Sequence, residues 1–154
     1  MESNRSNTPD GILLSDWESV KELAAEYANA IVLSPNDKSA TKLRKRMLRL
    51  LNRMSSKYGD RPSILATKAD YLSSDRRRAG VLEKAFAMAK QMHDHRNMTW
   101  ISSSLAELYA EDIPDPSKEM LWIDRLGKAL VNCPDETEQA VYERLCSKTG
   151  VDHD

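Results

Sequence analysis

The sequence predicts an all-α fold, and three observations support that prediction. Helix-favouring Leu, Ala, Lys, Arg and Glu are frequent, whereas only five glycines and six prolines occur in 154 residues. Apolar residues recur at three- and four-residue steps along most of the chain. No segment alternates between apolar and polar residues for long enough to indicate a strand. We therefore expect one helical domain over residues 15–150, between flexible ends at 1–14 and 151–154.

The first two helices are expected over residues 15–33 and 39–58. In the first, Ser15 and Glu18 have the spacing of a capping box, which satisfies two backbone amides at a helix N-terminus. The second has the clearest apolar face in the chain, because its leucines and methionines fall on one arc at about 100° per residue. Asp60, just after its end, is a candidate N-cap for the next helix.

Five further helices are expected over residues 62–73, 74–92, 97–111, 115–133 and 135–150. The expected N-caps of the last four are Ser74, Asn97, Asp115 and Asp135. The loops between consecutive helices are short, and short loops favour antiparallel neighbours. The chain should therefore form three antiparallel helix hairpins, with the seventh helix as a C-terminal cap.

A degenerate pattern repeats through these hairpins. In the first helices it reads Val20-x-x-Leu23-Ala24-x-x-Tyr27, Ser102-x-x-Leu105-Ala106-x-x-Tyr109 and, more weakly, Leu65-x-x-Lys68-Ala69-x-x-Leu72. In the second helices it reads Leu43-x-x-x-Met47-x-x-Leu50, Leu82-x-x-x-Phe86-x-x-Ala89 and Trp122-x-x-x-Leu126-x-x-Ala129. This pattern resembles the signature of tetratricopeptide repeats, in which a small residue lets the paired helices approach closely.

The resemblance implies a right-handed superhelix whose first helices line a concave, protein-binding groove. The chain departs from the family in two ways. Its anchors Ala24, Ala69 and Ala106 are 45 and 37 residues apart rather than about 34, and the signature glycines are absent. An irregular helical bundle is therefore the alternative architecture.

The sequence offers little for catalysis, and we expect neither an enzyme nor a bound cofactor or metal. No GxGxxG, GxxxxGK[ST], GxSxG or HExxH motif is present. His93 and His95 are the only ligand-like pair, and a solvated helix end explains them. Cys133 and Cys146 form no CxxC, no apolar run approaches the roughly 18 residues of a membrane span, and no secretory signal is visible. We expect a cytoplasmic protein.

Two surfaces are candidates for binding another protein. The first is the groove implied by the resemblance, with outward positions that include Lys21, Asp70, Trp100, Ser103 and Glu107. This set is mildly acidic and holds one large aromatic residue, so a basic or amphipathic segment of a partner should bind there. Packing of Trp100 on a neighbouring hairpin is the alternative reading of that residue.

The second candidate is a basic stripe on the helix expected over residues 39–58. Its members, which all lie within about 60° of Lys42 around the helix axis, are Lys42, Lys45, Arg46, Arg49, Arg53 and Lys57. The stripe accounts for much of a charge block over residues 37–61, where nine basic side chains face two acidic ones. An acidic protein surface is the favoured partner, and a merely solvated face is the alternative. Nucleic acid is less favoured, because no aromatic residue interrupts the stripe and the pI is about 6.3.

These observations favour a non-enzymatic protein-binding module that acts as an adaptor, chaperone or inhibitor. An immunity protein or antitoxin that blocks a toxin by direct binding is one form of this hypothesis, because complementary charge gives fast association. The alternative function is a nucleic-acid-associated regulator that uses the basic stripe.

Overall fold

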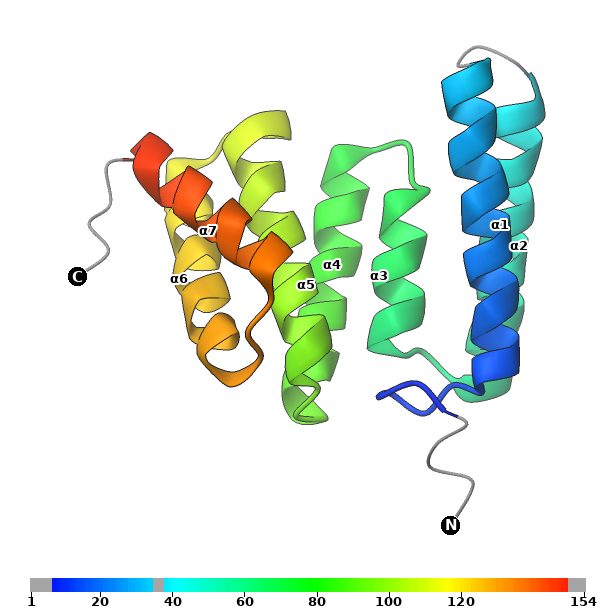
Figure 1. Cartoon of the computed structure of the whole chain (residues 1–154), viewed down its shortest axis with the longest axis horizontal. Coiled ribbons are helices and arrows are strands. Elements are labelled where there is room, and N and C mark those ends of the chain that lie inside the picture. The colour runs from blue at the N-terminus through cyan, green and yellow to red at the C-terminus, as the bar shows by residue number, and fades with distance from the viewer. Residues whose placement is uncertain (1–6, 35–37, 150–154) are drawn as a thin grey trace. The chain divides into compact units, whose positions relative to one another are not determined.

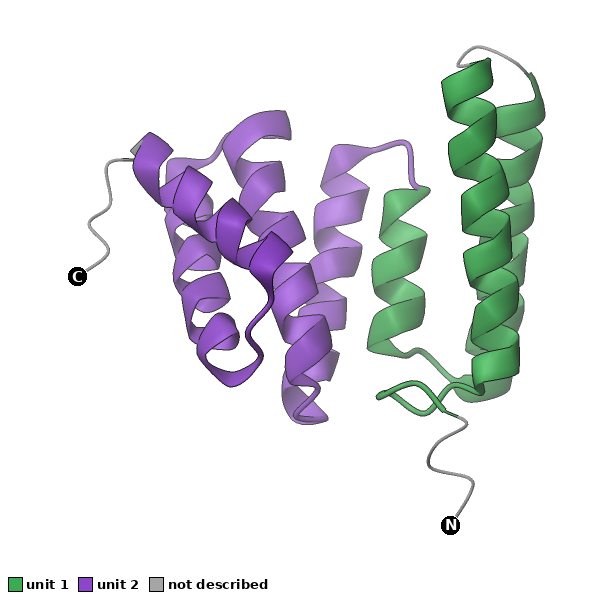
Figure 2. Cartoon of the chain, in the orientation of Figure 1, with its two compact units in different colours: residues 1–71 green, residues 72–154 purple. Residues whose placement is uncertain are grey.

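The computed structural model describes residues 7–34 and 38–149. Those residues form seven α-helices and a π-helical turn, without a β-strand among them, which confirms the prediction of an all-α fold (Figure 1). The single helical domain expected over residues 15–150 divides into two compact units, Met1–Tyr71 and Leu72–Asp154 (Figure 2). The two helices of the expected middle hairpin belong to different units.

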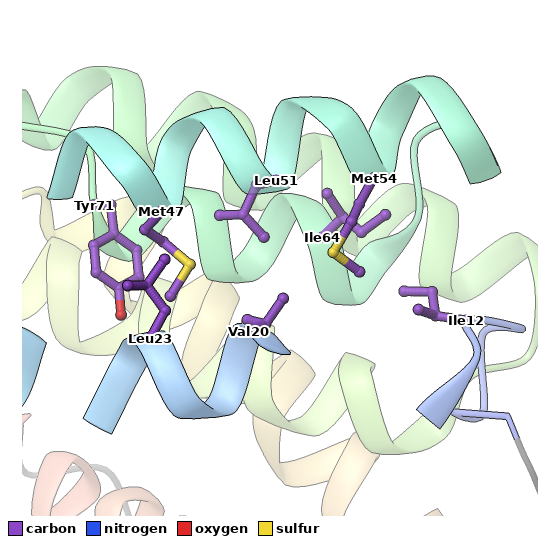
Figure 3. Packing of buried hydrophobic residues seen from close by; sticks show 8 residues of the cluster. All are labelled: Ile12, Val20, Leu23, Met47, Leu51, Met54, Ile64 and Tyr71. Atoms are coloured by element: carbon purple, nitrogen blue, oxygen red, sulfur yellow. The ribbon is translucent and has the colours of Figure 1, made fainter. Parts of the chain in front are cut away.

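The first unit holds α1 (Leu14–Leu33), α2 (Lys38–Tyr58) and α3 (Pro62–Asp70). Its core forms where the apolar faces of these helices meet, and α2 contacts both α1 and α3. The buried side chains of this cluster, drawn in Figure 3, are Ile12, Val20, Leu23, Met47, Leu51, Met54, Ile64 and Tyr71. Each fully buried Leu, Ile or Met side chain contributes about 1.5–3 kcal/mol of burial free energy.

The chain before α1 is part of this core, in contrast to the flexible segment expected over residues 1–14. Ile12 is fully buried, and the Asp10 side chain is also buried. One Asp10 carboxylate oxygen accepts a hydrogen bond from the backbone amide of Ser63 at 2.7 Å, and the other accepts one from the Thr8 hydroxyl at 2.7 Å. Gly11, with φ of +88°, lets the chain turn between these contacts. The remaining parts of the expected flexible ends, residues 1–6 and 151–154, lie outside the described residues.

Two predicted caps in the first unit are wrong. The N-cap position of α3 is Arg61, which makes no side-chain capping hydrogen bond, and the carboxylate that meets the α3 amide at Ser63 comes from Asp10 rather than Asp60. The N-cap of α1 is Leu13 instead of Ser15, again without a capping side chain. Residues 7–13 thus supply both the carboxylate at the start of α3 and the residue at the N-cap of α1.

The second unit holds α4 (Asp75–Gln91), α5 (His95–Glu107), the π-helical turn (Leu108–Asp112), α6 (Pro116–Asn132) and α7 (Glu136–Thr149). Helix α5 lies at its centre and contacts α4, α6 and α7. Ala106 is fully buried on α5. The Phe86 and Trp122 rings meet edge to face, with their centroids 4.9 Å apart. The small side chain and the interlocked rings account for the close packing of α4, α5 and α6.

Three of the four predicted N-caps in this unit are confirmed. Ser74, Asp115 and Asp135 each accept a hydrogen bond from the amide three residues later, at 3.3, 3.2 and 3.0 Å. The predicted cap at Asn97 is wrong, because α5 begins two residues earlier. Its cap is the buried Asp94, whose carboxylate accepts from the Asn97 amide at 3.2 Å and from its side chain at 2.6 Å.

Candidate protein-binding surfaces

The basic stripe lies on the solvent side of α2, as its periodicity predicts. The opposite side of α2 buries Met47, Leu51 and Met54, so the lysines and arginines between them point outward. Lys42, Lys45, Arg46, Arg49 and Arg53 are exposed, and none makes a hydrogen bond or ion pair with the described residues. The amphipathic pattern of α2 therefore produces an exposed row of cations that form no ion pair with the described residues.

Lys57, the last member of the stripe, is different because it is already paired. Its Nζ lies 2.8 Å from an Asp16 carboxylate oxygen, and Tyr58 donates its hydroxyl to the same oxygen. The hydrogen bond from Lys57 and that from Tyr58 lower the pKa of Asp16, and the Asp16 carboxylate raises the pKa of Lys57. These contacts join the start of α1 to the end of α2, so Lys57 serves the fold rather than a free surface.

Three stripe arginines line an open groove of about 650 Å³ between α1 and α2, called here the arginine groove. Arg46, Arg49 and Arg53 form its α2 wall, while Glu22 and Glu26 form its α1 wall. Leu23, which is buried, and Leu50, which is half-buried, also line the groove. These two leucines form an apolar strip with the arginines on one side and the glutamates on the other.

The glutamates of the α1 wall, like the arginines of the α2 wall, form no ion pair with the described residues. Glu22 and Glu26 are exposed, sit one helical turn apart, and make no ion pair within the described part of the chain. The nearby Glu18 pairs with Lys21 on its own helix at 3.2 Å. The groove therefore offers three guanidinium groups and two carboxylates to a ligand.

The residues predicted to line a repeat groove are divided between the two units. Lys21 is exposed on α1, and Asp70 is exposed at the end of α3. The other three, Trp100, Ser103 and Glu107, lie on α5 in the second unit. No single unit brings all five together, and their role in binding a partner stays a prediction.

On α5, the predicted groove residues meet α7. Ser103 is only 2% exposed, so the prediction that it points outward is wrong. Glu107 accepts a hydrogen bond from Arg144 of α7 at 3.0 Å, and Arg144 also reaches Glu111. The sequence predicts a C-terminal capping helix, and α7 packs on both α5 and α6, as Figure 1 also shows.

Trp100 lies at the edge of this α5–α7 contact. Its ring is 40% exposed, and the Arg96 guanidinium stacks over it at 4.5 Å from the ring centroid. The amide of Glu138, and further the Trp100 indole, lower the pKa of Asp135 by hydrogen bonding. Trp100 therefore contacts Arg96 on its own helix and Asp135 at the start of α7, and its role as an interface anchor stays a prediction.

A second hollow, of about 560 Å³, lies beside the π-helical turn and was not anticipated from the sequence. Arg76 and Lys118 line it, together with Glu83, Tyr109 and Asp115. Its acids have structural duties, since Glu83 accepts the Tyr109 hydroxyl at 2.8 Å and Asp115 caps α6. Burial and the Glu83 contact raise the pKa of Tyr109 to about 12, so its hydroxyl keeps its proton. These pairings leave less free charge here than in the arginine groove.

No group of three or more His, Cys, Asp or Glu side chains among the described residues could hold a metal ion. The exposed His93 and His95 flank the buried cap Asp94, and His93 has a left-handed φ of 55°, consistent with a helix end. None of the described helices combines the length and apolar character needed to cross a bilayer.

The tetratricopeptide resemblance depends on the residues quoted above, whose small anchors Ala69 and Ala106 are fully buried and whose Ala24 is half-buried. The arrangement of the helices as a superhelix stays a prediction. Neither a protein-family model, nor a curated protein, nor a solved structure matches this chain.

Proposed function

We propose that this chain is a protein-binding domain that recruits an acidic surface of another protein through the arginine groove. The observation that supports this most strongly is the set of three exposed, unpaired arginines on one wall of an open groove. A guanidinium group forms paired hydrogen bonds with a carboxylate and is weakly hydrated, which makes arginine a frequent anchor residue at protein interfaces. Adaptor, chaperone and inhibitor roles, including neutralisation of a toxin by an immunity protein, are open to such a domain.

The opposite wall favours a protein over a nucleic acid. A phosphate chain in the groove would bring its charges close to Glu22 and Glu26, and like charges at an interface are repulsive. The groove also lacks an aromatic side chain on which a base could stack. A protein can place carboxylates against the arginines and cations against the glutamates at the same time. The nucleic-acid regulator is therefore the weaker proposal.

Charge reversal on the groove provides the test. The full chain carrying R46E, R49E and R53E would be compared with wild type in affinity capture, followed by binding measurements on each purified partner. We expect the reversal variant to lose the partner, and wild-type binding to weaken as salt rises. A control variant, R76E/R77E/K90E, makes the same charge change at three exposed residues of α4 and should keep the partner.

Equal partner binding by wild type and the groove variant would refute the proposal, provided circular dichroism shows the same helix content. Binding to single- or double-stranded polynucleotides is measured in parallel at moderate salt. Polynucleotide binding that is lost in R46E/R49E/R53E would favour the nucleic-acid regulator instead.

A further inference from the structure

We infer that the arginine groove receives an amphipathic α-helix of the partner, with acidic residues on one flank, an apolar seam, and basic residues on the other flank. This inference builds on the proposed function and specifies the form and charge pattern of the bound segment. It rests on three features of the groove: the spacing of the arginines, the apolar strip beside them, and the acidic wall opposite.

The spacing of the arginines fits a helix better than an extended chain. Arg46, Arg49 and Arg53 follow one another at steps of three and four residues, which correspond to rises of about 4.5 and 6.0 Å along α2. A partner helix lying alongside repeats the same steps, so acidic residues at positions i, i+3 and i+7 stay level with all three guanidinium groups. Alternate side chains of an extended strand are about 6.7 Å apart, which overshoots the first step by about 2 Å.

The apolar strip gives the bound helix a seam to bury. Leu23 of α1 and Leu50 of α2 line the groove between its charged walls, and Leu50 keeps part of its side chain exposed. Helices that dock in grooves place apolar residues at i, i+3, i+4 and i+7 against such a strip. The bound helix would then be the third member of a bundle with α1 and α2, at the usual interaxial distances of about 8–10 Å.

The acidic wall determines which helices are excluded. Glu22 and Glu26 are one turn apart and unpaired within the described residues, so a helix that is acidic on every side would meet repulsion there. A helix with lysine or arginine on that flank gains two contacts instead. The two walls together select one charge arrangement and one orientation of the helix about its own axis.

The test uses three synthetic peptides of about 20 residues, a length at which isolated helices become appreciable. The matched peptide carries Glu at i, i+3 and i+7 on one flank, Leu in the seam and Lys on the other flank. The second peptide has the same composition, with the charges exchanged between the flanks at every other turn. The third carries acidic residues at alternate positions and two central prolines, so it remains extended. Binding of each labelled peptide to the full chain is followed by fluorescence anisotropy at low and moderate salt.

We expect the matched peptide to bind at least tenfold more tightly than either of the others. R46E/R49E/R53E should abolish that preference, while R76E/R77E/K90E should preserve it. In the variant E22K/E26K, the matched peptide should bind more weakly, and a helix that is acidic on both flanks should bind more tightly than it does to wild type.

The possible outcomes separate the inference from the proposed function. If the extended peptide or the exchanged peptide binds as tightly as the matched one, and R46E/R49E/R53E abolishes that binding, the helical occupant is refuted and the acidic-partner proposal survives. If no acidic peptide binds, or if groove reversal leaves binding unchanged, both are refuted. Tighter binding of a polynucleotide than of any peptide would also refute both.

Discussion

Replacing Asp10 by Ala tests whether a side chain outside the helices stabilises the first unit. The substitution removes two hydrogen bonds of 2.7 Å to a buried carboxylate, one from the Ser63 amide and one from the Thr8 hydroxyl. It also removes a negative charge from the N-terminal turn of α3, where the helix dipole favours one. The Ser63 amide would lose its side-chain acceptor at a partly buried position.

The expected loss is about 2–3 kcal/mol of unfolding free energy. A side-chain cap typically contributes about 1 kcal/mol, and a hydrogen bond to a charged group contributes about 1.5–3 kcal/mol. The hydrogen bond from the Ser63 amide counts both as a helix cap and as a hydrogen bond to a charged group, so the two contributions are not added. Asp10→Asn keeps an acceptor oxygen but not the charge, and should cost about 1 kcal/mol.

Urea unfolding followed by circular dichroism measures both variants, and amide hydrogen exchange at Ser63 reports on the local effect. Exchange at Ser63 should accelerate more than exchange in the middle of α2. A loss below about 0.5 kcal/mol for Asp10→Ala, within the range of ordinary surface substitutions, would show that the cap has no stabilising role.

Four further predictions concern the second unit. Gly80→Ala should stabilise by about 0.5–1 kcal/mol, because an added Cβ meets nothing within 4 Å and Ala is the better helix former. Gly127→Ala should be less favourable than Gly80→Ala by about 1 kcal/mol or more of unfolding free energy, because its Cβ would lie 3.0 Å from a tyrosine ring of α7. Equal changes for the two variants in urea unfolding would contradict this. Glu138→Gln should stabilise the protein near pH 7 but not near pH 3. Burial raises the pKa of Glu138, so the wild-type protein loses stability as pH rises and this carboxyl group ionises, whereas Gln stays neutral. A stabilisation that does not change with pH would disprove this. Arg144→Gln should reduce the stability lost on acidification, because Arg144 lowers the pKa of Glu111 and that stabilisation disappears as pH falls through the lowered value; parallel urea midpoint–pH curves would oppose it.

The positions of the helices could be predicted because their signals are local. Apolar periodicity places all seven, and caps such as Ser74 and Asp115 use amides only three residues away. The Asp10 cap was missed because its target lies 53 residues later, and no local pattern encodes such a pair. The π-helical turn was missed for a related reason, since periodicity near 100° per residue does not distinguish one wider turn.

In the candidate site, too, the features that depend on local spacing could be predicted and those that depend on tertiary contacts could not. The exposed stripe on α2 follows from the spacing of its residues, and Arg46, Arg49 and Arg53 also form one wall of a groove between α1 and α2. The acidic wall was not foreseen, because Glu22 and Glu26 become its partners only when α1 packs on α2. Burial of Ser103 was likewise decided by the docking of α7, a tertiary contact that α5 alone does not reveal.

The contact between Asp10 and Ser63 also has a consequence for synthesis on the ribosome. Because 53 residues separate the two, Asp10 is made well before its partner, by about 3–10 s at translation rates of ~5–20 residues per second. Helix α2 is complete only at Tyr58, five residues before Ser63, so α1 and α2 can pair only in the last part of that interval. For most of the interval the Asp10 carboxylate is on the nascent chain without the α3 amide that it meets in the folded unit.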